Sequence, residues 1–274
     1  MTNLFIKSLL RKIRINRIIT RLLGTQFHTN INRIEIDVTW NCNLHCKNCD
    51  RSCRQAPTQE QMSIQQIQKF VFESQQNHKK WEQIRILGGE PTLHPDILAI
   101  LKILENYKNF YSPETKLILI SNGYGPIVHS ILKKLPKSIV IKDTVKQSPD
   151  QSTFEPFNIA PIDLPGYQQT NFLNGCWITT YCGLALNRHG YYPCGVAGGI
   201  DRVFGLCLGK LQMPKEPSEM LPVLDACCRL CGHFLRGYFI PKEKRELVNQ
   251  EPCSPTWKKA YQNFISHKPE LPFF

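Results

Sequence analysis

A chain of 274 residues that is 42% hydrophobic can bury one sizeable core and leaves room for only a small additional module. Its 12 cysteines at close CxxC-type spacings favour metal ligation over a disulfide framework, and no signal peptide is evident. No stretch reaches the ~20 uninterrupted apolar residues of a membrane-spanning helix. Because no signal peptide is evident and the cysteine spacing suits metal ligation, we expect a cytoplasmic protein. The net charge is +12, but no aromatic-plus-basic motif is visible, so we do not expect nucleic-acid binding.

The excess of positive charge is concentrated at the N-terminus. Residues 1–30 contain six Lys or Arg and no acid. Phe5, Leu9 and Ile13 share one face of a helical wheel, and basic side chains lie roughly opposite, which predicts a partly amphipathic helix. Two interpretations remain open: the helix contacts an anionic membrane surface or a partner, or it is a solvated element that covers one end of the core.

From residue 34 to about 142, strand and helix patterns alternate. We expect strands at 34–38, 84–87, 117–120 and 138–141, and helices that begin at a capping box at Ser63, after Pro95 and over 126–135. Such alternation predicts an α/β fold, a partial (β/α) barrel with parallel strands and outer helices. Residues 143–175 have no clear period, and we expect extended connections there with one or two further strands.

Three motifs follow the first three predicted strands. Cys42, Cys46 and Cys49 have CxxxCxxC spacing, Gly88-Gly89-Glu90-Pro91 closes the second strand, and Ser121-Asn122-Gly123 ends the third. Because the carboxyl ends of parallel strands meet at one edge, we expect these motifs to form one site. Three thiolates hold three irons of a [4Fe–4S] cluster and leave the fourth open to a ligand.

The cysteine spacing resembles the cluster motif of the radical S-adenosylmethionine (radical SAM) superfamily, and Gly-Gly-Glu-Pro resembles its methionine-binding motif. The resemblance implies that Cys42, Cys46 and Cys49 ligate a [4Fe–4S] cluster that binds SAM. Most relatives carry an aromatic residue near the adenine where this chain has Asn48, which could bond the adenine edge but cannot stack. The cofactor-binding residues implied are Gly88, Gly89, Glu90, Pro91, Ser121, Asn122 and Asn48, with the Gly-Gly backbone and Glu90 on the methionine ammonium.

A second cysteine-rich region follows Cys176. Residues 184–194 read as a hairpin with a His-Gly turn, and this resembles the hairpin of the auxiliary-cluster modules called SPASM and twitch. The resemblance implies a second [4Fe–4S] cluster on Cys194, Cys228 and Cys231, with either Cys176 or Cys182 as the fourth ligand. A zinc site is the alternative here, and Cys53 could complete a zinc site with the first three cysteines. Asp201, Tyr181 and His189 are acid–base candidates by sequence proximity alone.

The predicted organisation has four parts: a basic helix at 1–30, a radical SAM partial barrel at 31–170, a SPASM/twitch-like module at 171–240 and a C-terminal tail at 241–274. The function implied is reductive SAM cleavage to a 5′-deoxyadenosyl radical that abstracts hydrogen from a small-molecule, sugar or lipid-linked substrate. A ribosomal-peptide maturase is one alternative, and a non-catalytic electron carrier or zinc scaffold is another. The partners implied are SAM, the substrate, a reductant such as flavodoxin or ferredoxin, and a membrane surface at the N-terminal helix.

Overall fold

The computed structural model describes residues 2–149, 155–240 and 251–274. Its centre is a six-stranded sheet in the order β4-β3-β2-β1-β5-β6. All neighbouring pairs are parallel except β5–β6, which is an antiparallel hairpin. The strands are β1 (Arg33–Thr39), β2 (Gln83–Gly88), β3 (Lys116–Ser121), β4 (Val140–Asp143), β5 (Leu184–Asn187) and β6 (Gly190–Tyr192). The predicted α/β class with parallel strands is confirmed.

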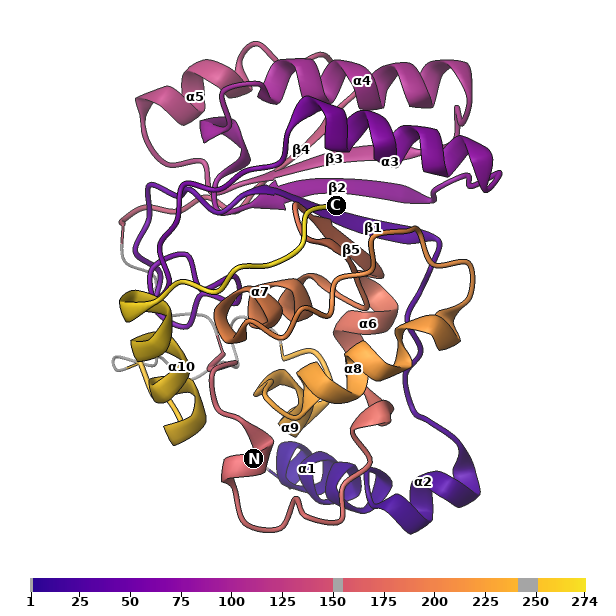
Figure 1. Ribbon diagram of the computed structural model, residues 1–274, viewed down its shortest axis with the longest axis vertical. Helices are drawn as coiled ribbons and strands as arrows, with labels where there is room; N and C mark the ends of the chain where they lie inside the picture. The colour runs from indigo at the N-terminus through magenta and orange to yellow at the C-terminus, as the bar shows by residue number, and fades with distance from the viewer. Residues whose placement is uncertain (1, 150–154, 241–250) are drawn as a thin grey trace.

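Helices cover both faces of the sheet (Figure 1). One face carries α3 (Ile64–Gln76), α4 (Ile97–Phe110) and α5 (Pro126–Leu132). The other side holds α6 (Trp177–Tyr181), α7 (Gly195–Phe204), α8 (Leu221–Cys228), α9 (His233–Arg236) and α10 (Pro255–Ser266). At the far end lie α1 (Thr2–Arg14) and α2 (Arg17–Leu23), so the N-terminal region forms two helices where the sequence predicts one.

The central strand β1 buries both of its faces, but with different side chains. Ile34, Ile36 and Val38 of β1 enter the core beneath α3 and α4, as the strand period predicts. The intervening Glu35 and Asp37 point to the other side and are also buried. The Ser63–Gln66 capping box that begins α3 is present as predicted.

The second cysteine region is continuous with the main sheet. β5 pairs in parallel with β1, from Ile34 opposite Leu184 to Ile36 opposite Leu186. Between β4 and β5 the described residues contain no strand, so the one or two strands expected there are not found in that part of the chain. The predicted boundary near residue 170 therefore falls between elements that share one sheet.

The predicted C-terminal tail is partly helical. Trp257 of α10 is fully buried and packs edge-on against Phe157 and Phe204. The last residue, Phe274, packs on Tyr191 of β6, so the chain returns to the sheet (Figure 1). Residues 241–250 of the predicted tail lie outside the described residues.

Candidate functional site

The three motifs that follow β1, β2 and β3 line one cavity of about 210 Å³. The lining includes Cys42, Cys46, Cys49, Gly88, Gly89, Ser121 and Asn122. The sheet brings them together because its parallel strands end at a common edge. Glu90, Pro91 and Asn48, which the sequence places in the same site, do not line this cavity.

The two glycines let two backbone segments approach closely. Gly88 has φ +141°, and a Cβ there would lie 2.1 Å from the carbonyl oxygen of Thr39. A Cβ on Gly89 would lie 2.3 Å from the carbonyl oxygen of Asn41. The N–H groups of Gly89 and Glu90 donate to these same two carbonyls, at 2.8 Å each. The Gly-Gly segment is therefore fastened to the start of the cysteine loop, where only glycine allows so close an approach.

Glu90 is fully buried and bonded entirely to the protein. Its Oε1 accepts from the Thr92 hydroxyl at 2.7 Å and from the Ser121 hydroxyl at 3.0 Å, and its Oε2 accepts from the Asn122 N–H at 2.7 Å. The carboxylate thus joins the end of β2 to the end of β3. Its contact with a methionine ammonium stays a prediction, and in this structure Glu90 positions the residues that do reach the cavity.

Asn122 connects the end of β3 to the cysteine loop. Its Nδ2 donates to Asn43 Oδ1 at 2.8 Å and lies 3.9 Å from Cys42 Sγ. The amide of Asn43 in turn donates to the Tyr124 carbonyl at 2.6 Å. Hydrogen bonds to a ligating sulfur tune the metal group that it binds, so Asn122 has a second possible role beside a SAM contact. Asn43 was not predicted as a site residue, because it occupies a position that the cysteine motif leaves unspecified.

The thiols of the first loop differ in their electrostatic surroundings. Burial raises the pKa of Cys42 to about 11 and that of Cys46 to about 12. A hydrogen bond from the Cys53 thiol lowers the pKa of Cys49, and the same bond raises that of Cys53. Metal ligation would lower these pKa values, because it supplies the positive charge that stabilises thiolates.

A second cavity of about 200 Å³ adjoins the first and shares the lining residues Asp50, Arg51 and Leu87 with it. Asn48 lines this second cavity, is fully buried, and has φ +53°. Neither its Oδ1 nor its Nδ2 has a hydrogen-bond partner within the described residues. Because a buried amide without partners costs free energy, its position indicates a ligand that completes the bonding.

A buried ionic network separates the two cavities. Arg51, from the cysteine loop, bonds Glu35 at 2.8 Å, Asp37 at 3.3 Å and Asp50 at 3.0 Å, and Arg85 reaches Glu35 at 3.1 Å. Burial raises the pKa of Asp37 to about 6 against the opposing effect of Arg51. The sequence pattern predicts a strand at 34–38 but did not lead us to expect that its acidic residues form this network. The alternation of Glu35 and Asp37 with Ile34, Ile36 and Val38 was the available signal.

Four cysteines of the second region lie together on the helical side. Cys176 and Cys194 are the residues before α6 and α7, Cys228 is the last residue of α8, and Cys231 follows it. All four are buried, and their mutual proximity acts with burial to raise the pKa values of Cys228 and Cys231 well above the ordinary range. Cys182 lies elsewhere, with its Sγ 3.6 Å from Arg85 Nη1 in the ionic network.

Arg11 of α1 reaches into this group of cysteines from outside the predicted module. Its Nη2 donates to the carbonyl of Gly175 at 2.5 Å and to that of Phe234 at 3.0 Å, beside Cys176 and after Cys231. Burial lowers the pKa of Arg11 to about 10, and Cys176 and Cys228 are the groups that most oppose this shift. Within the described residues no carboxylate forms an ion pair with it. A buried guanidinium needs an anion, and metal-bound thiolates would supply one.

The remaining candidates from the sequence have structural partners. Asp201 accepts from the Tyr192 hydroxyl at 2.7 Å and is fully buried. His189 stacks on Trp40, and Tyr181 is half exposed beneath the Arg85 guanidinium. No three His, Cys, Asp or Glu residues in the described ranges are arranged to hold a single metal ion.

The cysteines without an assigned role are also placed. Cys207 is exposed, Cys227 is buried with its Sγ 3.8 Å from the Ala197 carbonyl, and Cys253 is half-buried. Cys227 adjoins the group formed by Cys176, Cys194, Cys228 and Cys231, because burial acts together with Cys194 and Cys231 to raise its pKa well above the ordinary range. Cys207 and Cys253 make their hydrogen bonds to other parts of the chain.

Parts of this chain are similar in sequence to known proteins. A GTP 3′,8-cyclase from Campylobacter jejuni subsp. doylei is 30% identical over 105 residues, which are 38% of this chain and 31% of that protein. A protein of Methanocaldococcus jannaschii, named as a glycyl-radical enzyme activating enzyme, is 34% identical over 90 residues, or 32% of this chain and 30% of that protein. The chain thus spans less than a third of the length of either relative.

A solved structure with a similar arrangement is that of BtrN in complex with AdoMet and 2-DOIA. It aligns with a TM-score of 0.46 and 12% identity, over 75% of this chain and 94% of that one. The radical SAM superfamily model matches residues 36–145, from the middle of β1 to just beyond β4. That segment carries Cys42, Cys46 and Cys49 and both of the other strand-end motifs, so nearly all of the residues that line the cysteine cavity lie in the part of the chain that matches the radical SAM superfamily model.

Proposed function

We propose that this protein is a radical SAM enzyme, which cleaves SAM reductively and abstracts hydrogen from a substrate carbon. The observation that carries the proposal is the single cavity lined by Cys42, Cys46 and Cys49 together with the Gly88-Gly89 backbone and Asn122. The cluster, when bound, supplies one electron to the SAM sulfonium, and cleavage then yields methionine and a 5′-deoxyadenosyl radical. Everything else at the site concerns how the chain binds and orients the reactants.

Each strand end contributes one part of the binding site. The three cysteines would hold the cluster, and the amide of Asn122 near Cys42 Sγ would orient that ligand. The carbonyl oxygens of Gly88 and Gly89 would accept from the methionine ammonium, and Glu90 would hold Ser121 and Asn122 in register with them. Pro91 fixes the turn that follows, as the first residue of a short 3₁₀ helix. The amide of Asn48, which has no hydrogen-bond partner among the described residues, would bond the adenine edge.

A second, auxiliary cluster on Cys176, Cys194, Cys228 and Cys231 is part of the proposal. The group contains four thiols, and the buried Arg11 beside it has no carboxylate partner among the described residues. Both features suit an anionic metal–thiolate group. Four thiolates leave no iron open, so such a cluster would transfer electrons and would not bind substrate. Cys182, the alternative fourth ligand, suits this role less, because it is bonded to Arg85 in the ionic network.

The cavity lined by Asn48, Arg51 and Cys182 is the candidate for the substrate site. It adjoins the cysteine-lined cavity and contains carboxylate, guanidinium and apolar walls, among them Glu35 and Trp177. A volume of about 200 Å³ suits a small polar substrate or the head of a larger one, such as a sugar or a lipid-linked molecule. A ribosomal-peptide maturase is the second candidate, since a single side chain of a peptide would also fit.

Further partners follow from this chemistry. SAM and an external reductant, such as flavodoxin or ferredoxin, are needed for each turnover. The exposed N-terminal helices are the candidate for a contact with a membrane surface, which would place a cytoplasmic enzyme near lipid-linked substrates.

Anaerobic reconstitution with iron and sulfide, followed by dithionite and SAM, tests the proposal. We expect about eight irons per chain and release of 5′-deoxyadenosine. About four irons with 5′-deoxyadenosine would remove the auxiliary cluster from the proposal. Bound zinc, or iron without SAM cleavage, would support a zinc scaffold or an electron carrier. Glu90→Ala should abolish SAM cleavage with iron retained, whereas Glu82→Ala, an exposed acid at the start of β2, should not.

A further inference from the structure

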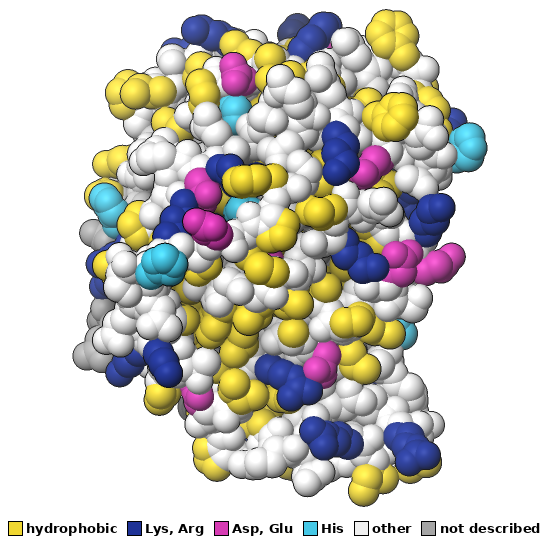
Figure 2. Space-filling view, viewed as in Figure 1, with side chains coloured by type: hydrophobic (Ala, Val, Ile, Leu, Met, Phe, Trp, Pro, Cys, Tyr) yellow, Lys and Arg dark blue, Asp and Glu magenta, His cyan; other side chains and the backbone are white. Residues whose placement is uncertain are grey.

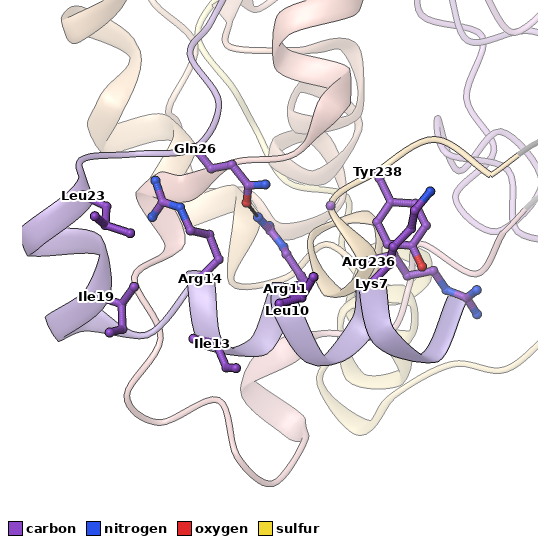
Figure 3. Close-up of a pocket in the computed structure, with 11 residues that line it drawn as sticks. Lys7, Leu10, Arg11, Ile13, Arg14, Ile19, Leu23, Gln26, Arg236 and Tyr238 are labelled. Carbon is purple, nitrogen blue, oxygen red and sulfur yellow. Dashed lines mark hydrogen bonds between the residues drawn. The ribbon is translucent and has the colours of Figure 1, made fainter. Parts of the chain in front are cut away.

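The first helix, α1, exposes its apolar side chains and buries a basic one, which is the reverse of an ordinary surface helix. Its apolar side chains Phe5, Ile6, Leu9, Leu10 and Ile13 fill an arc of about 140° on the helical wheel, yet each is at least 50% exposed. Arg11 lies on the opposite side of the helix, and its side chain is buried. Figure 3 shows Arg11 rising from α1 towards Gln26 and the body of the protein, with Ile13 projecting away from it.

The second helix extends the same apolar surface. Ile18, Leu22 and Leu23 of α2 are between 67% and 76% exposed. A groove of about 470 Å³ runs between the two helices, and Leu10, Ile13, Ile19 and Leu23 form its apolar walls (Figure 3). Surface helices normally bury their apolar stripe against the core, so a stripe of this size without a protein cover indicates an external apolar phase or partner.

The positive charge around α1 and α2 indicates that the partner of this apolar surface is anionic. The groove is lined by Lys7, Arg11, Arg14 and Arg236 and by no acid. Exposed Lys12, Arg17 and Arg21 add further positive charge, and residues 1–30 contain no Asp or Glu. Figure 2 shows dark-blue and yellow side chains, and no magenta ones, at the lowest end of the molecule, where α1 and α2 lie. Cations that flank an exposed apolar stripe suit anionic headgroups above an acyl phase.

Two other arrangements fit less well. A second copy of this chain on the same surface would bring two acid-free, basic surfaces together, which is repulsive. Crossing the bilayer is not indicated either, because none of the described helices has the length and apolar character that a span requires. A helix that lies in the plane of the interface needs neither, since lipid adapts its shape to the side chains.

We propose that α1 and α2 form a docking surface for an anionic lipid bilayer, with Phe5, Leu9 and Ile13 inserted among the acyl chains and the basic side chains at the headgroups. Arg11 anchors this surface to the body of the protein through Gly175 and Phe234. The inference deepens the membrane contact named under the proposed function, and it is independent of the proposed reaction because it depends on no cysteine and on no bound SAM.

Flotation of the full chain with vesicles tests the proposal. We expect binding to vesicles of phosphatidylcholine with phosphatidylglycerol, weak binding to phosphatidylcholine alone, and a decrease in binding as salt screens the charges. The double variant Phe5→Ser/Leu9→Ser should bind at least about tenfold less. Leu98→Ser/Phe110→Ser, which removes exposed apolar side chains from α4 at the other end of the molecule, is the matched control and should bind normally.

A second pair of variants tests the charge. Lys12→Gln/Arg21→Gln should weaken binding to the anionic vesicles by about tenfold, whereas Lys133→Gln/Lys134→Gln, with the same change in net charge, should not. All of these side chains are exposed, and thermal melting followed by circular dichroism will show that each variant folds. Absence of vesicle binding, or equal losses in test and control variants, would overturn the proposal. Concentration-dependent dimerisation lost in Phe5→Ser/Leu9→Ser would assign the surface to a second copy instead. Measuring 5′-deoxyadenosine on the same samples separates this result from the proposed activity.

Discussion

The two cysteine regions of this protein differ in how open they are. Cys42, Cys46 and Cys49 are half-buried on one loop and line a cavity at the edge of the sheet. The second region is buried at the ends of α6, α7 and α8 and consists of Cys176, Cys194, Cys228 and Cys231. Arg11 of α1 donates to the carbonyls of Gly175 and Phe234 beside these cysteines. The first region has three thiols beside a cavity that could hold a ligand, and the second region has four thiols beside the guanidinium of Arg11. Access of a ligand to the thiols therefore distinguishes the two proposed cluster sites, whereas the number of cysteines does not.

The largest expected effect comes from the open region. Cys49→Ala should remove about four irons per chain and abolish 5′-deoxyadenosine formation, because two thiolates cannot hold the cluster firmly. Iron analysis and chromatography of the reaction products measure both. Cys207→Ala, at an exposed cysteine, is the control and should retain both. Full SAM cleavage in Cys49→Ala would remove the distinction between the two regions.

The enclosed region is tested by a pair of cysteines that the sequence could not rank. Cys176→Ala should remove about four irons and leave uncoupled 5′-deoxyadenosine formation measurable, since the first cluster stays in place. Cys182→Ala should retain all of the iron, because Cys182 is bonded to Arg85. Iron counts per chain with electron paramagnetic resonance distinguish the two. The reverse result would make Cys182 the ligand.

The ionic network between the regions should contribute strongly to stability. Arg51→Met leaves Glu35 and Asp37 buried without their main counter-ion and should lower the free energy of unfolding by about 3–5 kcal/mol. Arg33→Met breaks an exposed pair with Glu82 at 2.7 Å and should cost at most about 1 kcal/mol. Urea denaturation of both variants under anaerobic conditions measures these differences. Equal losses would show that Arg51 is not a structural connection between the regions.

The smallest expected effect concerns Arg11. Arg11→Gln should lower the reduction potential of the proposed auxiliary cluster by tens of millivolts, because a nearby positive charge favours the more negative reduced state. Arg11→Lys, which keeps the charge, should shift it less, and the potential of the first cluster should not change. Redox titration followed by electron paramagnetic resonance resolves the two clusters. An unchanged potential with intact iron would limit Arg11 to holding the helix.

Much of the sheet and its motifs was predictable from the sequence. The strand–helix alternation from 34 to 142 and the capping box at Ser63 are local patterns, and the structure confirms them. The meeting of the three motifs at one sheet edge followed from parallel pairing alone. The strand ends moved by a residue or two, as for β4 at Val140–Asp143 in place of 138–141.

Contacts between distant parts of the chain were not predictable. Nothing local shows that Arg11 would reach Gly175 and Phe234, or that Glu90 would be bonded to Thr92, Ser121 and Asn122. The choice between Cys176 and Cys182 also depends on such contacts, because both have plausible spacings. The buried charges on β1 were missed for another reason: a strand buried on both faces is expected to be apolar throughout.

The pairing of β5 with β1 affects when the protein can fold. Ile34, Ile36 and their partners Leu184 and Leu186 are about 150 residues apart in sequence, so this contact is slow to form. During synthesis, β1 can pair with β2 early, but its other edge stays unpaired until the ribosome has released β5. An unpaired central edge is prone to aggregation. Chains truncated before residue 184 are therefore expected to be poorly soluble.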